Sequence, residues 1–189
     1  MKLLEQRILE DGIIIDNDIL KVDSFINHQI DVSLVRSIAK EINEEFKAFG
    51  VNKILTIETS GIAFAYAAAE VMGDLPLVFT KKSKSATVGN DVYKSEVKSF
   101  TRNIVSPITV AEKYLNKGDV VLIVDDFLAE GNASLGLIDL CKQAGAKVVG
   151  VAVAIEKGFQ PGRKRLEELG IKVYSAANVK AFVDNKPVF

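Results

Sequence analysis

The sequence predicts an α/β fold in which a parallel sheet is flanked by helices. The runs VVLIV (residues 120–124) and VVGVAVAI (residues 148–155) lack the alternation of apolar and polar residues that is typical of a sheet with one exposed face. Both runs are therefore typical of strands buried on two faces. Strand-like and helix-like segments also alternate along the chain, and this order favours parallel strands joined by helices.

Residues 31–50 are expected to form the first core helix. Asp31 is a candidate N-cap, and Gly50 is a candidate stop signal. Between them the apolar residues recur at helical spacing, which predicts one buried face. These apolar residues are Leu34, Val35, Ile38, Ile42, Phe46 and Phe49.

The order strand, turn, helix then occurs three times. Gly145 and Gly170 stand where the second and third helices should end, because glycine readily adopts the left-handed conformation of a helix C-terminus. The first unit has a strand at 53–58, a turn at 60–61 and a helix at 62–72. The second has a strand at 119–124, a turn at 125–131 and a helix at 132–144. The third has a strand at 147–155, a turn at 157–158 and a helix at 163–169, and a final strand follows at 171–175.

Two segments do not fit this repeat. Residues 12–30 are expected to form a small cap together with a C-terminal strand, and residues 80–110 a loop that carries a hairpin. No internal repeat, low-complexity tract or proline-rich linker divides the chain, so we expect one domain over residues 1–189. The loop at about 80–103 is expected to be mobile and basic. Its charged residues are Lys81, Lys82, Lys84, Lys94, Lys98 and Arg102, against Asp91 and Glu96.

The composition excludes several classes of protein. Lys and Arg total 24 and Asp and Glu total 25, so a net charge of -1 gives no basic footprint for general binding to nucleic acid or membrane surfaces. No apolar run reaches the ~18 residues of a membrane-spanning helix. The N-terminal segment is amphipathic and carries Glu5, Glu10 and Asp11, which favours a surface helix over a signal peptide. We therefore expect a cytoplasmic protein.

The chain has one cysteine, Cys141, and one histidine, His28. One cysteine allows no intrachain disulfide and no cysteine-rich metal site, which fits a reducing compartment. With a single histidine, zinc hydrolases and catalytic triads built on several histidines are poor candidates. Catalysis is therefore expected to depend on other groups.

Two consecutive carboxylates, Asp125 and Asp126, follow the predicted strand at 119–124. Adjacent carboxylates suit the vicinal hydroxyls of a ribose, or a magnesium ion reached through water, because they supply several oxygen acceptors in a small volume. The loop after them offers backbone N–H groups at a helix N-terminus, which favours a phosphate. Together these features predict a site for a phosphorylated sugar. The alternative is that the two aspartates only cap the helix.

Three loops are expected to share this site. In a parallel α/β sheet ligands bind beyond the carboxyl ends of the strands. Residues 58–61, 125–134 and 156–159 all follow predicted strands, so they should converge on one edge of the sheet.

Residues 120–134 resemble the phosphoribosyl diphosphate signature of the type I phosphoribosyltransferases. That signature is a hydrophobic strand, two acids and a loop that usually reads Ala-Thr-Gly-Gly-Thr. Here the loop is Ala129, Glu130, Gly131, Asn132 and Ala133. Glu130 and Ala133 stand at two hydroxyl positions, so backbone donors should bind more of the phosphate. We expect the Glu130 side chain to point to solvent, since a carboxylate repels a phosphate, and Ser134 to supply a hydroxyl nearby.

The chain also resembles the bacterial xanthine phosphoribosyltransferases of this family over nearly its whole length. The segments ILKVDSFINHQID (19–31), TIETSGIAFA (56–65) and IEKGFQPGR (155–163) occur in the same order and at matching spacing. The resemblance implies the type I phosphoribosyltransferase fold, with the small cap over the base site. It implies transfer of the 5-phosphoribosyl group from phosphoribosyl diphosphate to N9 of xanthine, which gives xanthosine monophosphate and diphosphate. It also implies a homodimer, with Mg²⁺ held mainly through phosphoribosyl diphosphate.

The same resemblance assigns roles to individual residues. Asp125 and Asp126 become the catalytic pair, residues 129–133 bind phosphoribosyl diphosphate, and the turn at 58–61 cradles its diphosphate with backbone groups. Leu20, Asn27 and Lys157 are assigned to xanthine, and Phe159 could stack on the purine ring. The alternatives are ordinary structural roles: Asn27 as a helix cap, Lys157 at the surface, and Leu20 and Phe159 in the core. His28 is expected to be structural, with a role in base binding left open.

Other functions stay open from the sequence. An enzyme for guanine, hypoxanthine or adenine would share the acidic pair and differ in the cap. A regulator that senses phosphoribosyl diphosphate would need a DNA-binding module, and no basic helix-turn-helix segment is evident. A dinucleotide-binding fold is disfavoured because no G-x-G-x-x-G follows the first predicted strand.

Overall fold

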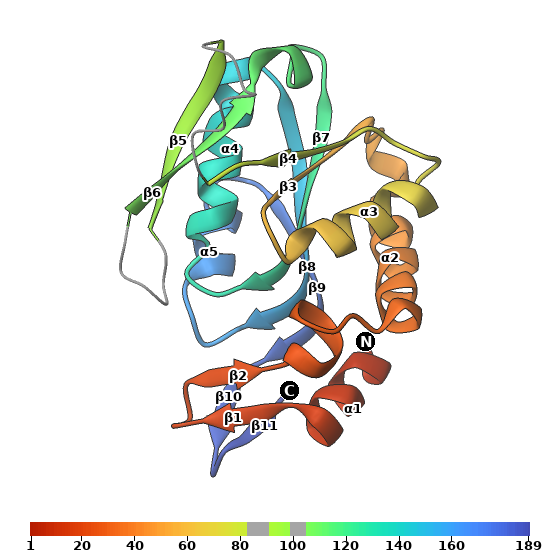
Figure 1. Cartoon of the computed structure of the whole chain (residues 1–189), viewed down its shortest axis with the longest axis vertical. Coiled ribbons are helices and arrows are strands. Elements are labelled where there is room, and N and C mark those ends of the chain that lie inside the picture. The colour runs from red at the N-terminus through yellow and green to blue at the C-terminus, as the bar shows by residue number, and fades with distance from the viewer. Residues whose placement is uncertain (83–90, 99–104) are drawn as a thin grey trace.

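The computed structural model describes residues 1–82, 91–98 and 105–189 of the chain. Its centre is a five-stranded parallel sheet in the order β4-β3-β7-β8-β9 (Figure 1). The strands are β3 (Lys53–Ile57), β4 (Leu77–Thr80), β7 (Val120–Leu128), β8 (Lys147–Lys157) and β9 (Lys172–Val179). The predicted α/β fold with a parallel sheet is confirmed.

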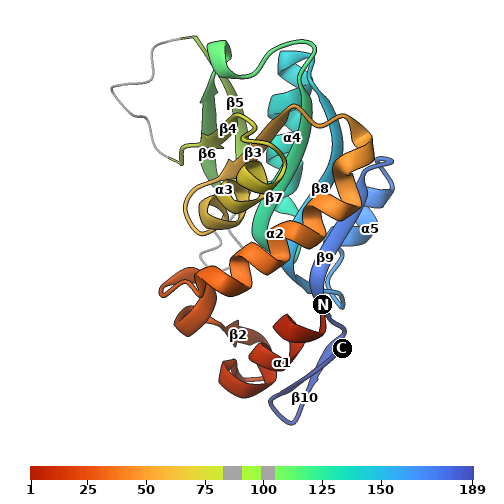
Figure 2. The same cartoon turned by 90° about the vertical axis from the view of Figure 1, so that its right-hand side faces the viewer.

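Helices cover both faces of this sheet. Helices α2 (Val32–Phe46) and α3 (Gly61–Val71) lie on one face, and α4 (Asn132–Ala144) and α5 (Gly162–Glu167) lie on the other (Figure 2). Along β7, Leu122 and Val124 pack toward α2 and α3, whereas Val121 and Ile123 pack toward α4. Both sets are buried, which explains why the strand is apolar at successive positions.

Helix α2 begins where its N-cap signal predicts. The Asp31 carboxylate accepts hydrogen bonds from the backbone N–H groups of Ser33 and Leu34, both at 3.1 Å. The α-helix ends at Phe46 and continues as a 3-10 turn, η2 (Lys47–Phe49), before Gly50 adopts a left-handed conformation with φ of 66°. Phe49, expected on the buried face, is 41% exposed because this tighter turn rotates it out of the helical register.

The strands continue further than the apolar runs predict. Strand β7 was expected to end at residue 124, with a turn from Asp125, but it continues to Leu128, where the backbone still pairs with Glu156 of β8. Strand β8 likewise extends to Lys157, which pairs with Val179 of β9. The predicted ends were wrong because the residues become polar while the ladder of backbone hydrogen bonds continues. Helix α5 is correspondingly shifted and shorter than expected.

A small layer of structure lies beyond the carboxyl ends of the strands, at the bottom of Figure 1. It contains α1 (Lys2–Asp11), the hairpin of β1 (Ile13–Ile15) and β2 (Ile19–Lys21), the π-helical turn η1 (Asp23–Asn27), and the hairpin of β10 (Ala181–Val183) and β11 (Lys186–Val188). The hairpin tips join reciprocally. The backbone N–H of Asn17 donates to Asn185 Oδ1 at 3.1 Å, and that of Asn185 donates to Asn17 Oδ1 at 2.8 Å.

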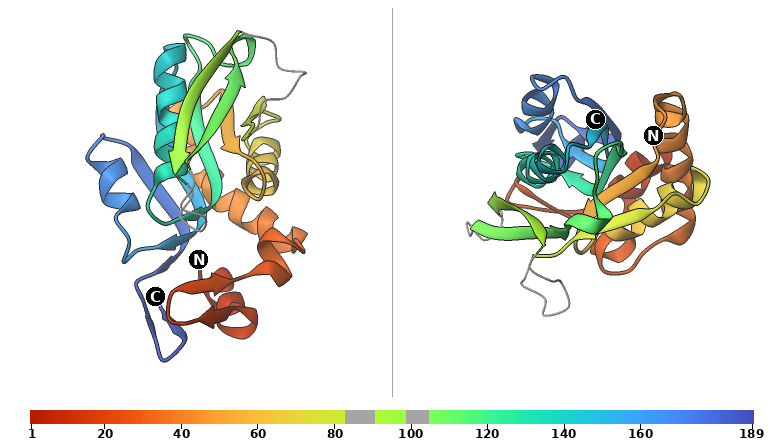
Figure 3. Two further views of the ribbon diagram at one scale, coloured as in Figure 1. Left: turned by 60° about the vertical axis from the view of Figure 1, so that its left-hand side comes forward. Right: turned by 90° about the horizontal axis from the view of Figure 1, so that it is seen from above.

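A third hairpin packs against α4 (Figure 3). Strands β5 (Val92–Lys98) and β6 (Val105–Ala111) pair antiparallel, and η3 (Glu112–Tyr114) follows them. The expected hairpin at 80–110 is therefore present. Lys84 and Arg102, two members of the expected basic loop, lie outside the described residues. None of the helices in the described part of the chain has the length and apolar character needed to cross a membrane.

We predict that Asp31→Ala lowers the free energy of unfolding by about 1 kcal/mol, the typical effect of losing an N-cap side chain. The hydrogen bond from the Leu34 backbone, followed by that from the Ser33 hydroxyl, lowers the pKa of Asp31 below its ordinary value of 3.8. A lowered pKa stabilises the fold above that value, and this stabilisation is lost as the pH falls.

Urea denaturation at neutral and acidic pH measures both effects. Asp31→Asn retains the acceptor oxygen and serves as the matched control, with most of the stability retained. An Asp31→Ala deficit that stays the same down to strongly acidic pH would show that the ionised carboxylate is not the stabilising form.

Candidate functional site

The turn at residues 58–61 and the carboxyl end of β7 lie in direct contact. A Cβ atom on Gly61 would lie 2.5 Å from Asp125 Oδ1 and 2.5 Å from Thr56 Oγ1. No larger residue fits there without a shift of this turn, so glycine is required for the close approach. The peptide bond between Glu58 and Thr59 is cis. The Glu58 carboxylate accepts a hydrogen bond from the backbone N–H of Lys82 at 2.6 Å.

The acidic pair lies within β7. Asp125 is 6% exposed and Asp126 is half-buried, and the Asp126 backbone N–H donates to Asp125 Oδ1 at 2.9 Å. Burial raises the pKa of Asp125 well above its ordinary value of 3.8, and the neighbouring Asp126 carboxylate raises it further, while Lys82 opposes the rise. The N-cap position of α4 is occupied by Gly131. The two aspartates are therefore not helix caps.

The loop between β7 and α4 forms the second wall of the site. It consists of Ala129, Glu130 and Gly131, and Gly131 has φ of 80° at the start of α4. The first amides of α4 have no partners within the helix, so this end of α4 favours an anion. Asn132 and Ala133 are partly buried in the first turn, and Ser134 is buried. Glu130, expected to point to solvent, is half-buried.

The third predicted loop joins the site through the backbone. Gly162, at the start of α5, donates its N–H to the Ala129 carbonyl at 3.0 Å. The pairing of Leu128 with Glu156 brings the end of β8 alongside the end of β7. The three segments that were expected to converge therefore meet at the carboxyl edge of the sheet.

Lys157 links the sheet to the cap. The residue is 8% exposed, its Nζ donates to the Asp18 carbonyl at 2.7 Å, and it lies 5.9 Å from the centre of the Phe182 ring. Burial lowers the pKa of the Lys157 ammonium, and the Asp18 carboxylate opposes the change. Phe159 is 45% exposed and packs edge-on against Phe182, with ring centres 5.4 Å apart. Lys157 is thus a buried cation in contact with the cap.

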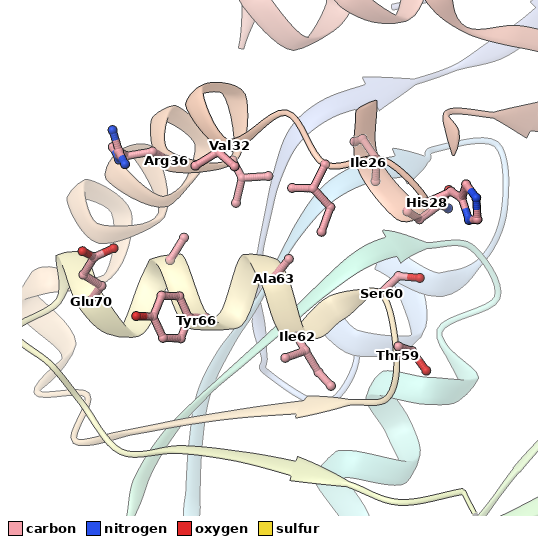
Figure 4. Close-up of a pocket in the computed structure, with 14 residues that line it drawn as sticks. Ile26, His28, Val32, Arg36, Thr59, Ser60, Ile62, Ala63, Tyr66 and Glu70 are labelled. Atoms are coloured by element: carbon pink, nitrogen blue, oxygen red, sulfur yellow. The ribbon is translucent and has the colours of Figure 1, made fainter. Parts of the chain in front are cut away.

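The two other residues assigned to the base come from the cap itself. Leu20 is buried in the core cluster that includes α2 and α3, and Asn27 is exposed at the end of η1. Asn27 and His28 line a pocket of about 790 Å³ between η1, α2 and α3 (Figure 4). The pocket reaches Thr59 and Ser60 of the 58–61 turn and is otherwise largely apolar. No pattern in the sequence indicates this pocket, because it forms between separate elements.

A buried ion pair near the site was also missed. Glu156 is 1% exposed, and Arg163 binds it with two hydrogen bonds, from Nε at 2.7 Å and from Nη2 at 2.6 Å. Ser175 on β9 donates its hydroxyl to the same carboxylate at 2.7 Å. The available signal was a single acid at the end of an apolar strand followed by an arginine seven residues later. Such a spacing identifies no contact until the path of the loop is known.

The sequence is similar to those of known phosphoribosyltransferases. A family model described as the phosphoribosyl transferase domain matches residues 21–183. The chain is 51% identical over 189 residues to xanthine phosphoribosyltransferase 2 of Clostridium botulinum, with all of both chains covered. It is 47% identical over 189 residues to xanthine phosphoribosyltransferase of Streptococcus agalactiae, covering 100% of this chain and 97% of that one.

Solved structures share the fold. Adenine phosphoribosyltransferase from Rhodothermus marinus superposes with a TM-score of 0.75 at 21% identity, covering 95% of this chain and 100% of that chain. The enzyme from Trypanosoma brucei, solved with AMP, pyrophosphate and ribose-5-phosphate, gives a TM-score of 0.76 at 18% identity, covering 93% and 79%. At these identities the likeness supports the shared fold alone.

We predict that Asp125→Asn raises the melting temperature at neutral pH in buffer without ligand or metal. A carboxyl with a raised pKa contributes stability that is fully present below the ordinary value of 3.8 and is lost as the pH rises through the folded-state pKa. Asparagine keeps the acceptor oxygen and has no charge to bury. The advantage of the variant should therefore shrink as the pH falls.

Thermal unfolding over a series of pH values measures this difference. Asp139→Asn, on the exposed surface of α4, is the matched control and should change the melting temperature little at any pH. A lower melting temperature for Asp125→Asn than for the parent protein at neutral pH would contradict the conclusion that burial disfavours the ionised Asp125 carboxylate.

Proposed function

The chain belongs to the phosphoribosyltransferase family, and from this premise we propose that it is a xanthine phosphoribosyltransferase. It transfers the 5-phosphoribosyl group from phosphoribosyl diphosphate to N9 of xanthine, which gives xanthosine 5′-monophosphate and diphosphate. The observation that carries the proposal is the meeting of an acidic strand end, an anion-favouring loop and the 58–61 turn at one edge. Identity of 47–51% along the full chain to enzymes of that name supports the choice of base.

The chemistry requires a leaving diphosphate and a positively charged ribose ring. Departure of diphosphate from the anomeric carbon leaves oxocarbenium-like charge, so catalysis depends on binding the leaving anion and tolerating that charge. The turn at 58–61 receives the diphosphate, and residues 129–133 receive the 5′-phosphate. Asp125 and Asp126 accept hydrogen bonds from the ribose hydroxyls, and their negative charge stabilises the developing positive charge. No covalent nucleophile takes part.

The proposed cofactor is Mg²⁺. Among the described residues no group of three His, Cys, Asp or Glu side chains is placed to hold a metal, so the diphosphate oxygens of the substrate supply most of the ligands. The adjacent carboxylates of Asp125 and Asp126 suit a hard cation directly or through water. When bound, Mg²⁺ neutralises charge on the diphosphate.

Base recognition is proposed at the junction of sheet and cap. Xanthine carries a 2-oxo group, which calls for a donor, and the Lys157 ammonium can donate to a ring carbonyl. Asn27 offers its amide, and Leu20 offers main-chain and packing contacts. Half-exposed Phe159 is available to stack on the ring. In the structure Lys157 donates to the Asp18 carbonyl, so base binding would exchange one acceptor for another.

The domain organisation, the compartment and the oligomeric state of the enzyme are also proposed. We propose that one domain spans residues 1–189 and that the protein acts in purine salvage, in the cytoplasm, as a homodimer. The buried free thiol of Cys141 fits a reducing compartment. The exposed side chains of Val32 and Tyr66 line the same largely apolar pocket, and a contiguous exposed apolar surface supports association with another subunit.

We predict that the protein forms nucleotide from phosphoribosyl diphosphate and Mg²⁺ fastest with xanthine. Separate reactions with xanthine, guanine, hypoxanthine and adenine, followed by chromatography of the products, test the base. A preference for another purine would retain the phosphoribosyltransferase reaction and refute the assignment of Leu20, Asn27 and Lys157 to xanthine. Failure with all four bases from folded protein would favour a sensor of phosphoribosyl diphosphate.

Variants at Lys157 complete this test. Lys157→Gln should raise the KM for xanthine by about tenfold or more, because a charge-assisted hydrogen bond to the base is lost, while the KM for phosphoribosyl diphosphate changes little. Lys147→Gln, at the exposed opposite end of β8, is the matched control. Equal changes in both KM values would argue against base contact by Lys157.

A further inference from the structure

The first turn of α5 holds the loop that follows β7. The backbone N–H of Gly162 donates to the Ala129 carbonyl at 3.0 Å. Arg165 Nη1 donates to the Glu130 carbonyl at 2.6 Å and to Asn132 Oδ1 at 2.9 Å. Two consecutive carbonyls of the loop therefore face α5, and each is held by a separate donor.

This arrangement determines where the neighbouring amides point. In a trans peptide the C=O and N–H bonds point in opposite directions. The cis bond of the described chain is at Glu58–Thr59, so the peptides after Ala129 and Glu130 are trans. Because both carbonyls face α5, the N–H groups of Glu130 and Gly131 point away from it. Successive amides with a shared direction, next to the start of a helix, are an arrangement that favours an anion.

The side chains of the loop offer little help in binding a phosphate. Residues 129–133 include no cation and no hydroxyl, and Glu130 is acidic. The Asn132 side chain is engaged by Arg165 through its oxygen. Binding of a phosphate here therefore depends on the orientation of the backbone, and that orientation depends on the donors that hold the two carbonyls.

Helix α5 is itself firmly attached. Besides its two bonds to Glu156, Arg163 donates to the Val173 carbonyl at 3.1 Å and to Ser175 Oγ at 3.2 Å. A Cβ on Gly162 would lie 2.3 Å from the Ala129 carbonyl oxygen, so helix and loop pack backbone to backbone. Glu156 immediately precedes Lys157. One short helix thus connects the strand end proposed for the base with the loop proposed for the phosphate.

We propose that Arg165 is a positioning residue that holds loop 129–133 in its phosphate-binding conformation. This inference rests on the proposed function, since it names the group that shapes the phosphate subsite of that reaction. Arg165 acts from behind the loop and does not touch substrate. Its planar guanidinium suits the task because one nitrogen reaches a backbone carbonyl and a side-chain oxygen together.

Steady-state kinetics and calorimetry of Arg165→Met and Arg165→Lys test the proposal. Arg165→Met should raise both the KM for phosphoribosyl diphosphate and the Kd for ribose 5-phosphate by about tenfold or more, with the KM for xanthine changed less than about twofold. Arg165→Lys keeps a charged donor without the planar fork, so it should give an intermediate value. Lys164→Met, whose side chain is 80% exposed on the same helix, is the matched control and should resemble the parent protein.

Several results would overturn the proposal. One is an unchanged affinity for ribose 5-phosphate in folded Arg165→Met, and another is an equal rise in the KM values for phosphoribosyl diphosphate and xanthine. If the methionine variant fails to fold, an unchanged affinity of Arg165→Lys for ribose 5-phosphate overturns the proposal instead. Far-ultraviolet circular dichroism and thermal unfolding establish the fold of each variant. If the parent protein binds ribose 5-phosphate but uses no purine, the proposed function fails while the calorimetric comparison still decides the role of Arg165. Absence of ribose 5-phosphate binding by the parent protein overturns both.

Discussion

Strand β7 pairs with β3 on one side and with β8 on the other, and this central position determines where the polar groups of the protein lie. Parallel strands end at a common edge, so the residues that follow β3, β7 and β8 come together without being close in sequence. The pairing with β8 extends through Leu128, so Asp125 and Asp126 stand on paired strand backbone and not on a loop. Groups on strands are held more accurately than groups on loops, which suits a site that must position a charged sugar.

That position has an energetic consequence at Asp125. The side chain is nearly enclosed, against Gly61 and beside Asp126, so its ionised form is disfavoured in the folded protein. A sequence selected only for stability would place an uncharged residue there. A ligand that brings hydroxyl donors and a cation would stabilise this buried carboxyl, and that explains its place next to an anion-favouring loop. In the proposed function, this destabilising carboxyl lies where the reaction uses it.

Local signals in the sequence predicted most helices and strands, but they did not predict contacts between residues that are far apart in the sequence. The Asp31 cap, the span of α4 and the left-handed Gly145 follow from residues adjacent in sequence. The ends of β7 and β8 were placed too early because polarity changes before pairing stops. The contact of Arg165 with the Glu130 carbonyl joins residues 35 apart and requires the path of β8 and α5. The pocket between η1, α2 and α3 likewise depends on how separate elements pack.

In the proposed function, backbone amides beyond β7 bind the sugar phosphate. Amide spectra of the isotope-labelled protein, recorded by nuclear magnetic resonance during addition of ribose 5-phosphate, test it most directly. The largest shifts are expected at Glu130, Gly131 and the first turn of α4, because the N-terminal end of a helix favours an anion. Largest shifts at Ile62 and Tyr66 in the pocket between α2 and α3, with the loop unchanged, would show that the phosphate does not bind to these amides.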